Sequence, residues 1–298
     1  MKSLYYLIIG MRPKQWTKNF LLFAGVVFTH NLSQIGRLTD AVSAFIIFCG
    51  LSGVIYLFND LRDGESDRQH PLKCQRPIAS GQLSEPLAWS AALIISVLCI
   101  VWAFFLNPKF GGYAVVYFII MVLYSAVLKH VVILDLLIVA IGFVIRAMAG
   151  VRAIELPGED LPITPWFITC ILFLALFIVI CKRRHELILL ADSASSHRPV
   201  LEHYSPAFLD QMVSVATTAS VLSYALYVVL GAPTTPKRNL MIMTLPFVLY
   251  GIFRYLYLVY KREEGGSPEN MLLRDIPMLV NIGLWAVVIV LIFYWPFG

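Results

Sequence analysis

The residues best suited to chemistry lie in an acidic stretch directly after a long apolar run. The run covers residues 41–58, and the next nine residues read Asn59-Asp60-Leu61-Arg62-Asp63-Gly64-Glu65-Ser66-Asp67. Asn59, Asp63 and Asp67 are spaced four residues apart, so a continuing helix would place these side chains on one face. Oxygen donors alone suit Mg²⁺, which proteins hold through a few carboxylates together with substrate phosphates. The stretch therefore predicts a magnesium site, although a solvated acidic loop capping a helix would have the same composition.

Asp60 stands apart from this pattern. On an ideal helix it points about 100° away from Asn59, so it either binds the metal after a local distortion or orients a neighbour such as Arg62. The candidate metal ligands are Asn59, Asp60, Asp63 and Asp67. Arg68, Lys73 and Arg76 follow at once, and cations beside an acidic cluster are what a site for a magnesium-bound diphosphate requires. The candidate catalytic residues are accordingly Asp63, Asp67, Lys73 and Arg76.

The composition is that of an integral membrane protein, with 59% hydrophobic and 14% charged residues. Nine apolar segments are long enough to span a bilayer, and no soluble domain is left between them. Their centres lie near Val26, Ile47, Ile95, Ile119, Ala140, Phe173, Val221, Leu249 and Val287. We therefore expect one all-α domain over residues 1–298, with nine transmembrane helices around a cavity that opens to the cytoplasm.

The distribution of basic residues predicts the orientation. With the N-terminus inside, inner segments hold sixteen of the 23 Lys and Arg residues, outer loops hold five, and Arg146 and Arg254 fall inside or near spans. This places the acidic stretch on the cytoplasmic side of a plasma (inner) membrane. The net charge of +5 reflects that bias and gives no hint of nucleic acid. The sequence leaves a homo-oligomer open.

Further polar residues mark the inner surface. Two long inner loops, 60–81 and 182–206, are expected to form the lid of the cavity. Tyr124, Lys129 and Asp135 lie between the fourth and fifth spans, and Arg146 lies about three helical turns deeper than Asp135. A charge at that depth needs a partner or a wet cavity. Arg146 therefore either forms a structural pair with Asp135 or contacts substrate.

At these residues the chain resembles the UbiA-type superfamily of intramembrane prenyltransferases. The family signature NDxxDxxxD appears as Asn59, Asp60, Asp63 and Asp67. Within the superfamily the chain is most similar to polyprenyl-phosphate phosphoribosyltransferases, typified by the decaprenyl-phosphate enzymes of actinobacterial arabinan synthesis. That resemblance rests on the blocks Met11–Asn19 and Asn59–Gly81, supported by Tyr124-Ser125, Leu128-Lys129, Leu134-Asp135, Arg146-Ala147, Lys182-Arg183, Glu186-Leu187 and Arg254-Tyr255.

One departure from the superfamily pattern bears on the substrate. Enzymes that use a prenyl diphosphate resemble one another in a second Asp motif after the sixth helix, but this chain reads Cys181-Lys182-Arg183-Arg184-His185-Glu186 there. Direct pairing of a phosphate by Lys182 and Arg183 fits that change, with Glu186 on a ribose hydroxyl or steering a cation. A lipid monophosphate, with the diphosphate on a second, water-soluble substrate, would explain it.

The resemblance implies the following reaction. The donor is 5-phosphoribosyl 1-diphosphate, the acceptor is a long-chain polyprenyl monophosphate, Mg²⁺ is the cofactor, and the product is a lipid-linked pentose precursor of envelope polysaccharide. Lys73 and Arg76 would bind the diphosphate or the 5-phosphate. The candidate substrate-binding residues are Lys14, Lys73, Arg76, Tyr124, Lys129, Asp135, Arg146, Lys182, Arg183 and Glu186. Anchoring to anionic lipids explains Lys14 at least as well.

Two other functions compete with this one. A prenyl-diphosphate-dependent aromatic or haem-type prenyltransferase would use the same scaffold, but it would need a second pair of acids. A membrane transporter would also explain many spans, but transporters place their decisive polar groups near the middle of the bilayer. Here the acids and most of the cations gather at one surface.

Overall fold

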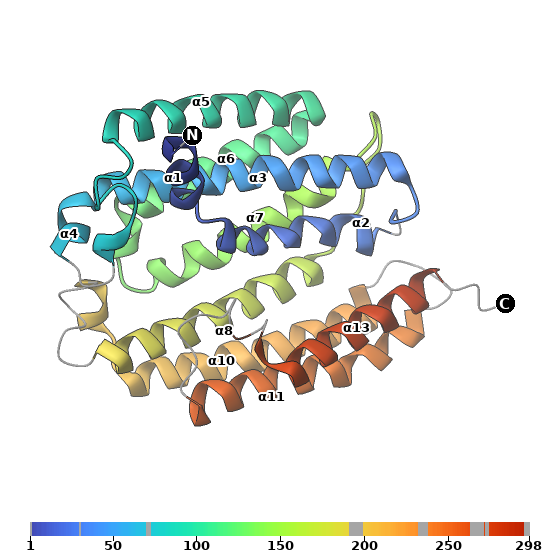
Figure 1. Cartoon of the computed structure of the whole chain (residues 1–298). Coiled ribbons are helices and arrows are strands. Elements are labelled where there is room, and N and C mark those ends of the chain that lie inside the picture. The colour runs from blue at the N-terminus through green and yellow to red at the C-terminus, as the bar shows by residue number, and fades with distance from the viewer. Residues whose placement is uncertain are drawn as a thin grey trace. The chain divides into compact units, whose positions relative to one another are not determined.

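The structure is a computed structural model that describes residues 2–29, 31–69, 73–190, 199–231, 238–262, 271 and 274–294. All regular structure in these ranges is helical (Figure 1). Eight helices there are long and apolar enough to cross a membrane: Ile35–Arg62, Glu85–Leu106, Pro108–Ala126, Leu134–Ala153, Pro165–Leu189, Pro206–Leu230, Leu240–Lys261 and Ile276–Tyr294. These helices confirm the expected all-α membrane architecture. A helix suits a bilayer because only helices and closed barrels satisfy all backbone hydrogen bonds there. The count of nine spans is not confirmed.

The first expected span, centred near Val26, differs from the prediction. The short helix α1 (Lys2–Gly10) is followed by a 3₁₀ helix, η1 (Pro13–Phe23), and by α2 (Ala24–Phe28). Runs of 3₁₀ helix longer than three or four residues are uncommon, so η1 depends on its neighbours. Buried Asn19 supplies one tie, because its amide donates to the hydroxyl of Ser52 at 3.2 Å. The polar residues in the first half of this segment therefore leave only a short α-helix, α2, after the 3₁₀ helix.

The described chain divides into two compact units. Unit 1 comprises Met1–Leu128 and Ile145–Leu161, and unit 2 comprises Lys129–Val144 and Pro162–Gly298. The boundary falls inside helix α7 (Leu134–Ala153). We describe each unit by itself, and the expected single domain over 1–298 stays a prediction.

In unit 1, the long helix α3 (Ile35–Arg62) is the central element. It packs against η1, α5 (Glu85–Leu106) and α6 (Pro108–Ala126), which Figure 1 shows alongside it. Phe48 of α3 lies against Tyr117 and Phe110 of α6, with ring centroids 5.0 and 5.7 Å away. Where the end of η1 meets α7, a Cβ on Gly150 would lie 2.1 Å from the carbonyl oxygen of Leu22. Only glycine permits that close backbone approach.

Unit 2 is built on α8 (Pro165–Leu190) and α10 (Pro206–Leu226), with α11 (Leu245–Lys261) and α13 (Ile276–Tyr294) beside them. Phe177 of α8 and Tyr255 of α11 meet edge to face in its buried core. Leu209 of α10 and Leu258 of α11 belong to the same buried cluster. The apolar faces of these helices thus hold the unit together.

The second inner loop begins later than the sequence predicts. Helix α8 continues to Leu190, so Lys182, Arg183 and Glu186 lie on its last turns and not in a loop. Residues 191–198 lie outside the described part of the chain, and a short 3₁₀ helix, η5 (Pro199–His203), precedes α10. Residues 70–72 of the first long loop also lie outside it. The proposed lid and the cytoplasmic cavity therefore stay predictions.

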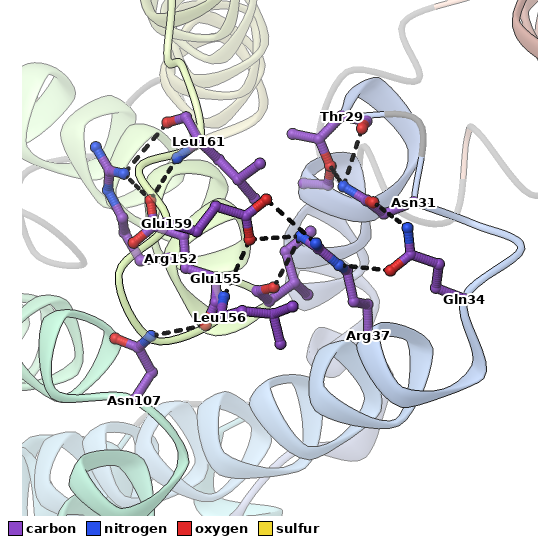
Figure 2. A network of polar contacts seen from close by, with 12 residues as sticks. Thr29, Asn31, Gln34, Arg37, Asn107, Arg152, Glu155, Leu156, Glu159 and Leu161 are labelled. Atoms are coloured by element: carbon purple, nitrogen blue, oxygen red, sulfur yellow. Dashed lines mark hydrogen bonds and ion pairs between the residues drawn. The ribbon is translucent and has the colours of Figure 1, made fainter.

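A network of polar side chains and backbone groups lies at the start of α3, within unit 1. Figure 2 shows Arg37 of α3 reaching the segment after α7, where its two terminal nitrogens donate to Glu159 at 2.9 and 3.1 Å. Arg37 also donates to Gln34 at 2.8 Å and to the carbonyl of Ile154 at 3.3 Å. Buried Glu155 accepts from the backbone N–H of Leu161 at 2.8 Å. We call this the Arg37 network.

Candidate active site

The acidic stretch lies at a bend where α3 gives way to α4 (Gly64–Gln69). Asp63 is the bend residue, with φ −90° and ψ 9°. The α-helical pattern of backbone hydrogen bonds, between residues four apart, continues through it. The N–H of Asp63 donates to the carbonyl of Asn59 at 2.9 Å, and the N–H of Asp67 donates to the carbonyl of Asp63 at 2.8 Å. The bend therefore keeps the helical progression of side chains from α3 into α4.

Asp60 and Asp67 are brought together at this bend. Both are 2% exposed. One nitrogen of Arg76, Nη1, lies 2.5 Å from an oxygen of Asp67 and 3.1 Å from an oxygen of Asp60. A second guanidinium, that of Arg12, donates to the same oxygen of Asp60 at 2.5 Å. Two buried carboxylates are thus balanced by two arginines, which lowers the cost of burying them.

The position of Asp60 differs from the sequence-based expectation, which set it apart from the stripe of Asn59, Asp63 and Asp67. Helical geometry explains the difference. A spacing of seven residues returns to within about 20° of the same direction, whereas two steps of four drift by about 80°. Asp60 and Asp67 therefore share a face more closely than Asn59 and Asp67 do.

Further predicted residues of unit 1 lie at the end of α3 and on η1, η2 and α6. Asn59 and Asp63 are half-buried, and the hydrogen bonds described above use their backbones. Lys73 is half-buried on a short 3₁₀ helix, η2 (Lys73–Gln75). Tyr124 is half-buried in the last turn of α6. Lys14 is exposed on η1, as the alternative of a membrane anchor would require.

Arg12 is the residue that sequence reasoning missed at this site. Its φ of 54° puts a non-glycine residue in the left-handed region, directly before Pro13. Its guanidinium carbon lies 4.8 Å from the ring centroid of Tyr56, which gives a cation–π contact beside the bond to Asp60. A strained backbone is thus used to bring a cation to a buried acid 48 residues away. The signals in the sequence were its place in the Met11–Asn19 block and beside the first apolar segment, which left Arg12 between an anchor to anionic lipids and a catalytic role.

The residues at the bend fit a magnesium ion. In the part of the chain that the structure describes, no three His, Cys, Asp or Glu side chains come together as a complete metal cage. Mg²⁺ does not need one, since it is usually held by one or two carboxylates together with water and substrate phosphates. The two buried carboxylates converge on a single cationic nitrogen, and a metal ion could take that position.

Arg146 is buried in unit 1 with partners other than the expected Asp135. Its Nε donates to the amide oxygen of Asn19 at 2.9 Å, and its Nη2 donates to the hydroxyl of Tyr117 at 2.6 Å. The guanidinium carbon also lies 4.7 Å from the Tyr117 ring centroid. Asp135 and Arg146 are eleven residues apart on α7, about 16 Å of helix rise, so the predicted direct pair is wrong. Arg146 instead ties η1 to α6 and α7.

A second cluster lies within unit 2, around Asp135. This fully buried carboxylate, in the first turn of α7, lies 3.2 Å from Nε of Arg183 and accepts a hydrogen bond from the hydroxyl of Tyr204 at 2.7 Å. Arg183 also pairs with Glu186, one turn along α8. The structure thus brings together three predicted residues, Asp135, Arg183 and Glu186. It adds Tyr204, which lies 69 residues from Asp135 and was not predicted from sequence.

The surroundings of this second cluster affect the ionisation of Tyr204. Burial raises the pKa of its hydroxyl above the ordinary value, and the hydrogen bond to Asp135 raises it further. The hydroxyl therefore stays protonated at neutral pH and keeps its donor role. Lys182 on α8 and Lys129 on the 3₁₀ helix η3 (Leu128–His130) are half-buried in the same unit.

Most of the chain is similar in sequence to known proteins. The sequence profile of the UbiA prenyltransferase family matches residues 20–282. The chain is 31% identical over 293 residues to a decaprenyl-phosphate phosphoribosyltransferase of Mycolicibacterium smegmatis, covering 94% of this chain and 89% of that protein. It is 33% identical over 294 residues to the protein of the same name from Corynebacterium glutamicum, covering 97% and 86%.

Solved structures agree on the fold. A UbiA homologue from Archaeoglobus fulgidus, solved with GPP and Mg²⁺, superposes with a TM-score of 0.72 over 97% of this chain and 99% of that one, at 20% identity. Identity this low supports the helical architecture and not the substrate. With a matching profile over most of its length and relatives at more than 30% identity, the chain belongs to the UbiA prenyltransferase family.

Proposed function

We propose that this protein transfers 5-phosphoribose from 5-phosphoribosyl 1-diphosphate to a long-chain polyprenyl monophosphate and releases diphosphate. The observation that carries the proposal is the nearly full-length similarity to two proteins named decaprenyl-phosphate phosphoribosyltransferase. The cations on the last turns of α8 support it, because Lys182 and Arg183 stand where a prenyl-diphosphate enzyme would need a second pair of acids. The active site would face the cytoplasm from a plasma membrane.

The diphosphate of the donor is assigned to the bend in unit 1. Asp60 and Asp67 would hold Mg²⁺, with Asn59 and Asp63 on the adjoining turn available as further oxygen donors. Bound there, the ion would neutralise charge that develops on the departing diphosphate. Arg12, Arg76 and Lys73 would pair with the phosphate oxygens.

Arg76 and Arg12 would change partners when this substrate binds. In the structure they balance the two buried carboxylates. Once a divalent cation takes over that role, both guanidinium groups become available to the diphosphate, and both are partly exposed. The site would thereby avoid leaving either the acids or the arginines without a counter-charge.

The phosphate of the lipid acceptor is assigned to the cluster in unit 2. Lys129, Lys182 and Arg183 are its candidate partners, and Arg183 would exchange Glu186 for a phosphate oxygen. Glu186 would then be available to a ribose hydroxyl. Asp135 would keep the guanidinium of Arg183 in place, since the two groups lie 3.2 Å apart.

The chemistry needs no strong general base. A phosphate oxygen of the lipid, already an anion at neutral pH, forms a bond to the anomeric carbon. The bond from that carbon to the diphosphate oxygen breaks, and its electron pair leaves with the diphosphate. The protein's part is to orient the two substrates and to stabilise charge on the leaving group.

A transfer assay with purified protein tests the proposal. Protein in nanodiscs would be incubated with ribose-labelled phosphoribosyl diphosphate, polyprenyl phosphate and Mg²⁺, and the lipid fraction would be extracted. We expect ribose label in the lipid, dependence on the polyprenyl phosphate, and no transfer in EDTA. Transfer of the prenyl group from a prenyl diphosphate to an aromatic acceptor, with no labelled lipid in the first reaction, would overturn the proposal in favour of an ordinary prenyltransferase.

A further inference from the structure

The turn that leads into α7 contains a strained residue. Ile133 has φ 69°, in the left-handed region that a β-branched side chain rarely adopts. Its side chain is 43% exposed, so packing of that side chain does not explain the conformation. Strain of this kind persists only where the surroundings enforce it, and it gathers at functional sites.

The hydroxyl of Tyr204 is hydrogen-bonded to this turn. The backbone N–H of Ile133 donates to this hydroxyl at 2.7 Å, and the hydroxyl in turn donates to Asp135 at 2.7 Å. Tyr204 itself is buried, and its ring stacks against Phe208 of α10 with centroids 6.2 Å apart. The hydroxyl is therefore held in place and accepts from one side of the turn while it donates to the other.

The strained turn lies between Lys129, which is assigned to phosphate binding, and Asp135, which holds the phosphate-binding residue Arg183. Lys129 lies four residues before Ile133, on η3, and Asp135 lies two residues after it, facing Arg183. A rotation about φ of Ile133 would move Lys129 relative to Asp135 and Arg183. All of these residues belong to unit 2.

We propose that Tyr204 is a positioning residue that locks the left-handed turn at Ile133 and thereby sets where Lys129 lies relative to Arg183 for binding of a phosphate group. The inference rests on the proposed function in so far as that function brings a phosphate to these two cations. Tyr204 does not touch the substrate in this role. Its ring packs in the core, and its hydroxyl holds the turn.

The first test needs no substrate. Tyr204→Phe keeps the ring and removes the hydroxyl, so the Ile133 amide loses its acceptor. We expect hydrogen exchange in a peptide covering 128–136 to become about tenfold faster, which is the effect of one lost hydrogen bond. Tyr260→Phe is the matched control, because its hydroxyl donates to Asp210 at 2.7 Å in the same unit but contacts no strained turn.

The second test separates positioning from general stability. Glycine adopts φ near 70° without strain, so Ile133→Gly should hold the turn without help from the hydroxyl. Tyr204→Phe should raise KM for the polyprenyl phosphate about tenfold and change kcat little. The same change made in the Ile133→Gly background should have a much smaller effect on KM and on exchange.

The outcomes decide between the inference and its alternatives. Equal losses from Tyr204→Phe with isoleucine and with glycine at position 133 would overturn the inference and leave Tyr204 a core residue. Unchanged exchange over 128–136 in Tyr204→Phe would overturn it as well. If the wild-type protein formed no labelled lipid, the proposed function would fail, while exchange and binding of inorganic phosphate would still report on the turn.

Discussion

The two ends of α3 both carry arginine–carboxylate clusters, but the clusters are built differently. At the start of the helix, Arg37 meets Glu159 through two separate nitrogens, and each carboxylate oxygen has its own donor. At the other end, one nitrogen of Arg76 serves both Asp60 and Asp67, and one oxygen of Asp60 accepts from two arginines. In the first cluster each carboxylate oxygen of Glu159 has a hydrogen-bond donor of its own. In the second cluster the two carboxylates share one arginine nitrogen.

The backbone around each cluster shows the same contrast. In the Arg37 network, main-chain groups take part: Glu159 accepts from the N–H of Leu156 at 3.1 Å, and Arg37 donates to the carbonyl of Ile154. At the acidic pair, only side chains contact the carboxylates in the bonds described, and Arg12 reaches Asp60 from a left-handed backbone. A cluster made of exchangeable side chains can accept a ligand, while one fixed to the main chain stabilises a loop.

The largest expected effect separates the two clusters by activity. Asp60→Asn and Asp67→Asn should each lower turnover by on the order of a hundredfold or more, because each removes a charged oxygen from the proposed metal site. Glu159→Gln, the same change in the Arg37 network, should leave turnover within about twofold. Magnesium titrations of the transfer reaction would measure both.

Asp63→Asn sharpens this prediction. The stripe drawn from sequence makes Asp63 and Asp67 the critical pair and Asp60 milder, whereas the structure places Asp60 beside Asp67. A severe Asp63→Asn together with a mild Asp60→Asn would show that the ligand-bound state follows the stripe.

The next effect concerns the cations of the N-terminal segment. Arg12→Ala should raise KM for the diphosphate substrate about tenfold, because a charge-assisted hydrogen bond is lost and buried Asp60 keeps only Arg76 as a described partner. Lys14→Ala, two residues along and exposed, should change KM for this substrate by less than about twofold. Steady-state kinetics with the donor varied would check both.

An equal response of the two variants would contradict the assignment of Arg12. It would indicate that both cations act through the membrane surface. Arg12→Lys is the conservative variant, and it should recover only part of the loss because lysine lacks the planar fork of arginine.

Sequence alone predicts the part of this protein that depends on composition and local spacing. Long apolar runs admit only helices in a bilayer, so α3 and α5 to α8 follow directly from residue type. The acidic stretch and the cations behind it are likewise local. The contacts that organise the site are not local, since Arg12 meets Asp60 across 48 residues and Tyr204 meets Asp135 across 69.

The structure differs from two local predictions for physical reasons. The first apolar segment carries Asn19 in its first half, and that side chain forms tertiary hydrogen bonds in η1. The basic residues after Cys181 suggested a loop, but α8 continues through them, with Arg183 and Glu186 paired at helical spacing. In the first case a buried polar residue was not expected to change the helix, and in the second polar residues were taken to end a helix to which they belong.

A smaller expected effect concerns stability at the Arg37 network. Arg37→Ala removes a buried guanidinium and should lower the free energy of unfolding by about 3 kcal/mol. This is the low end of the range for a broken buried ion pair, because Glu159 is partly exposed. Thermal unfolding in detergent, followed by intrinsic fluorescence, would measure it. Turnover per folded molecule should stay near that of the wild type. A selective loss of turnover without a loss of stability would make this network part of the active site.

The smallest expected effect is a pH dependence at the Arg37 network. The hydrogen bonds from Arg37 hold the pKa of Glu159 below its ordinary value. A carboxyl with a lowered pKa in the folded state contributes stability that is complete above its unfolded pKa of about 4.3 and is lost as pH falls through the folded value.

Between about pH 5 and 3, wild-type protein should therefore lose more of its thermal stability than Glu159→Gln, which has no proton to take up at that position. Unfolding midpoints of the two proteins at matched ionic strength would check this. Parallel curves would mean that Glu159 contributes no pH-dependent stability, and that the Arg37 network holds its loop through the buried arginine and the main chain alone.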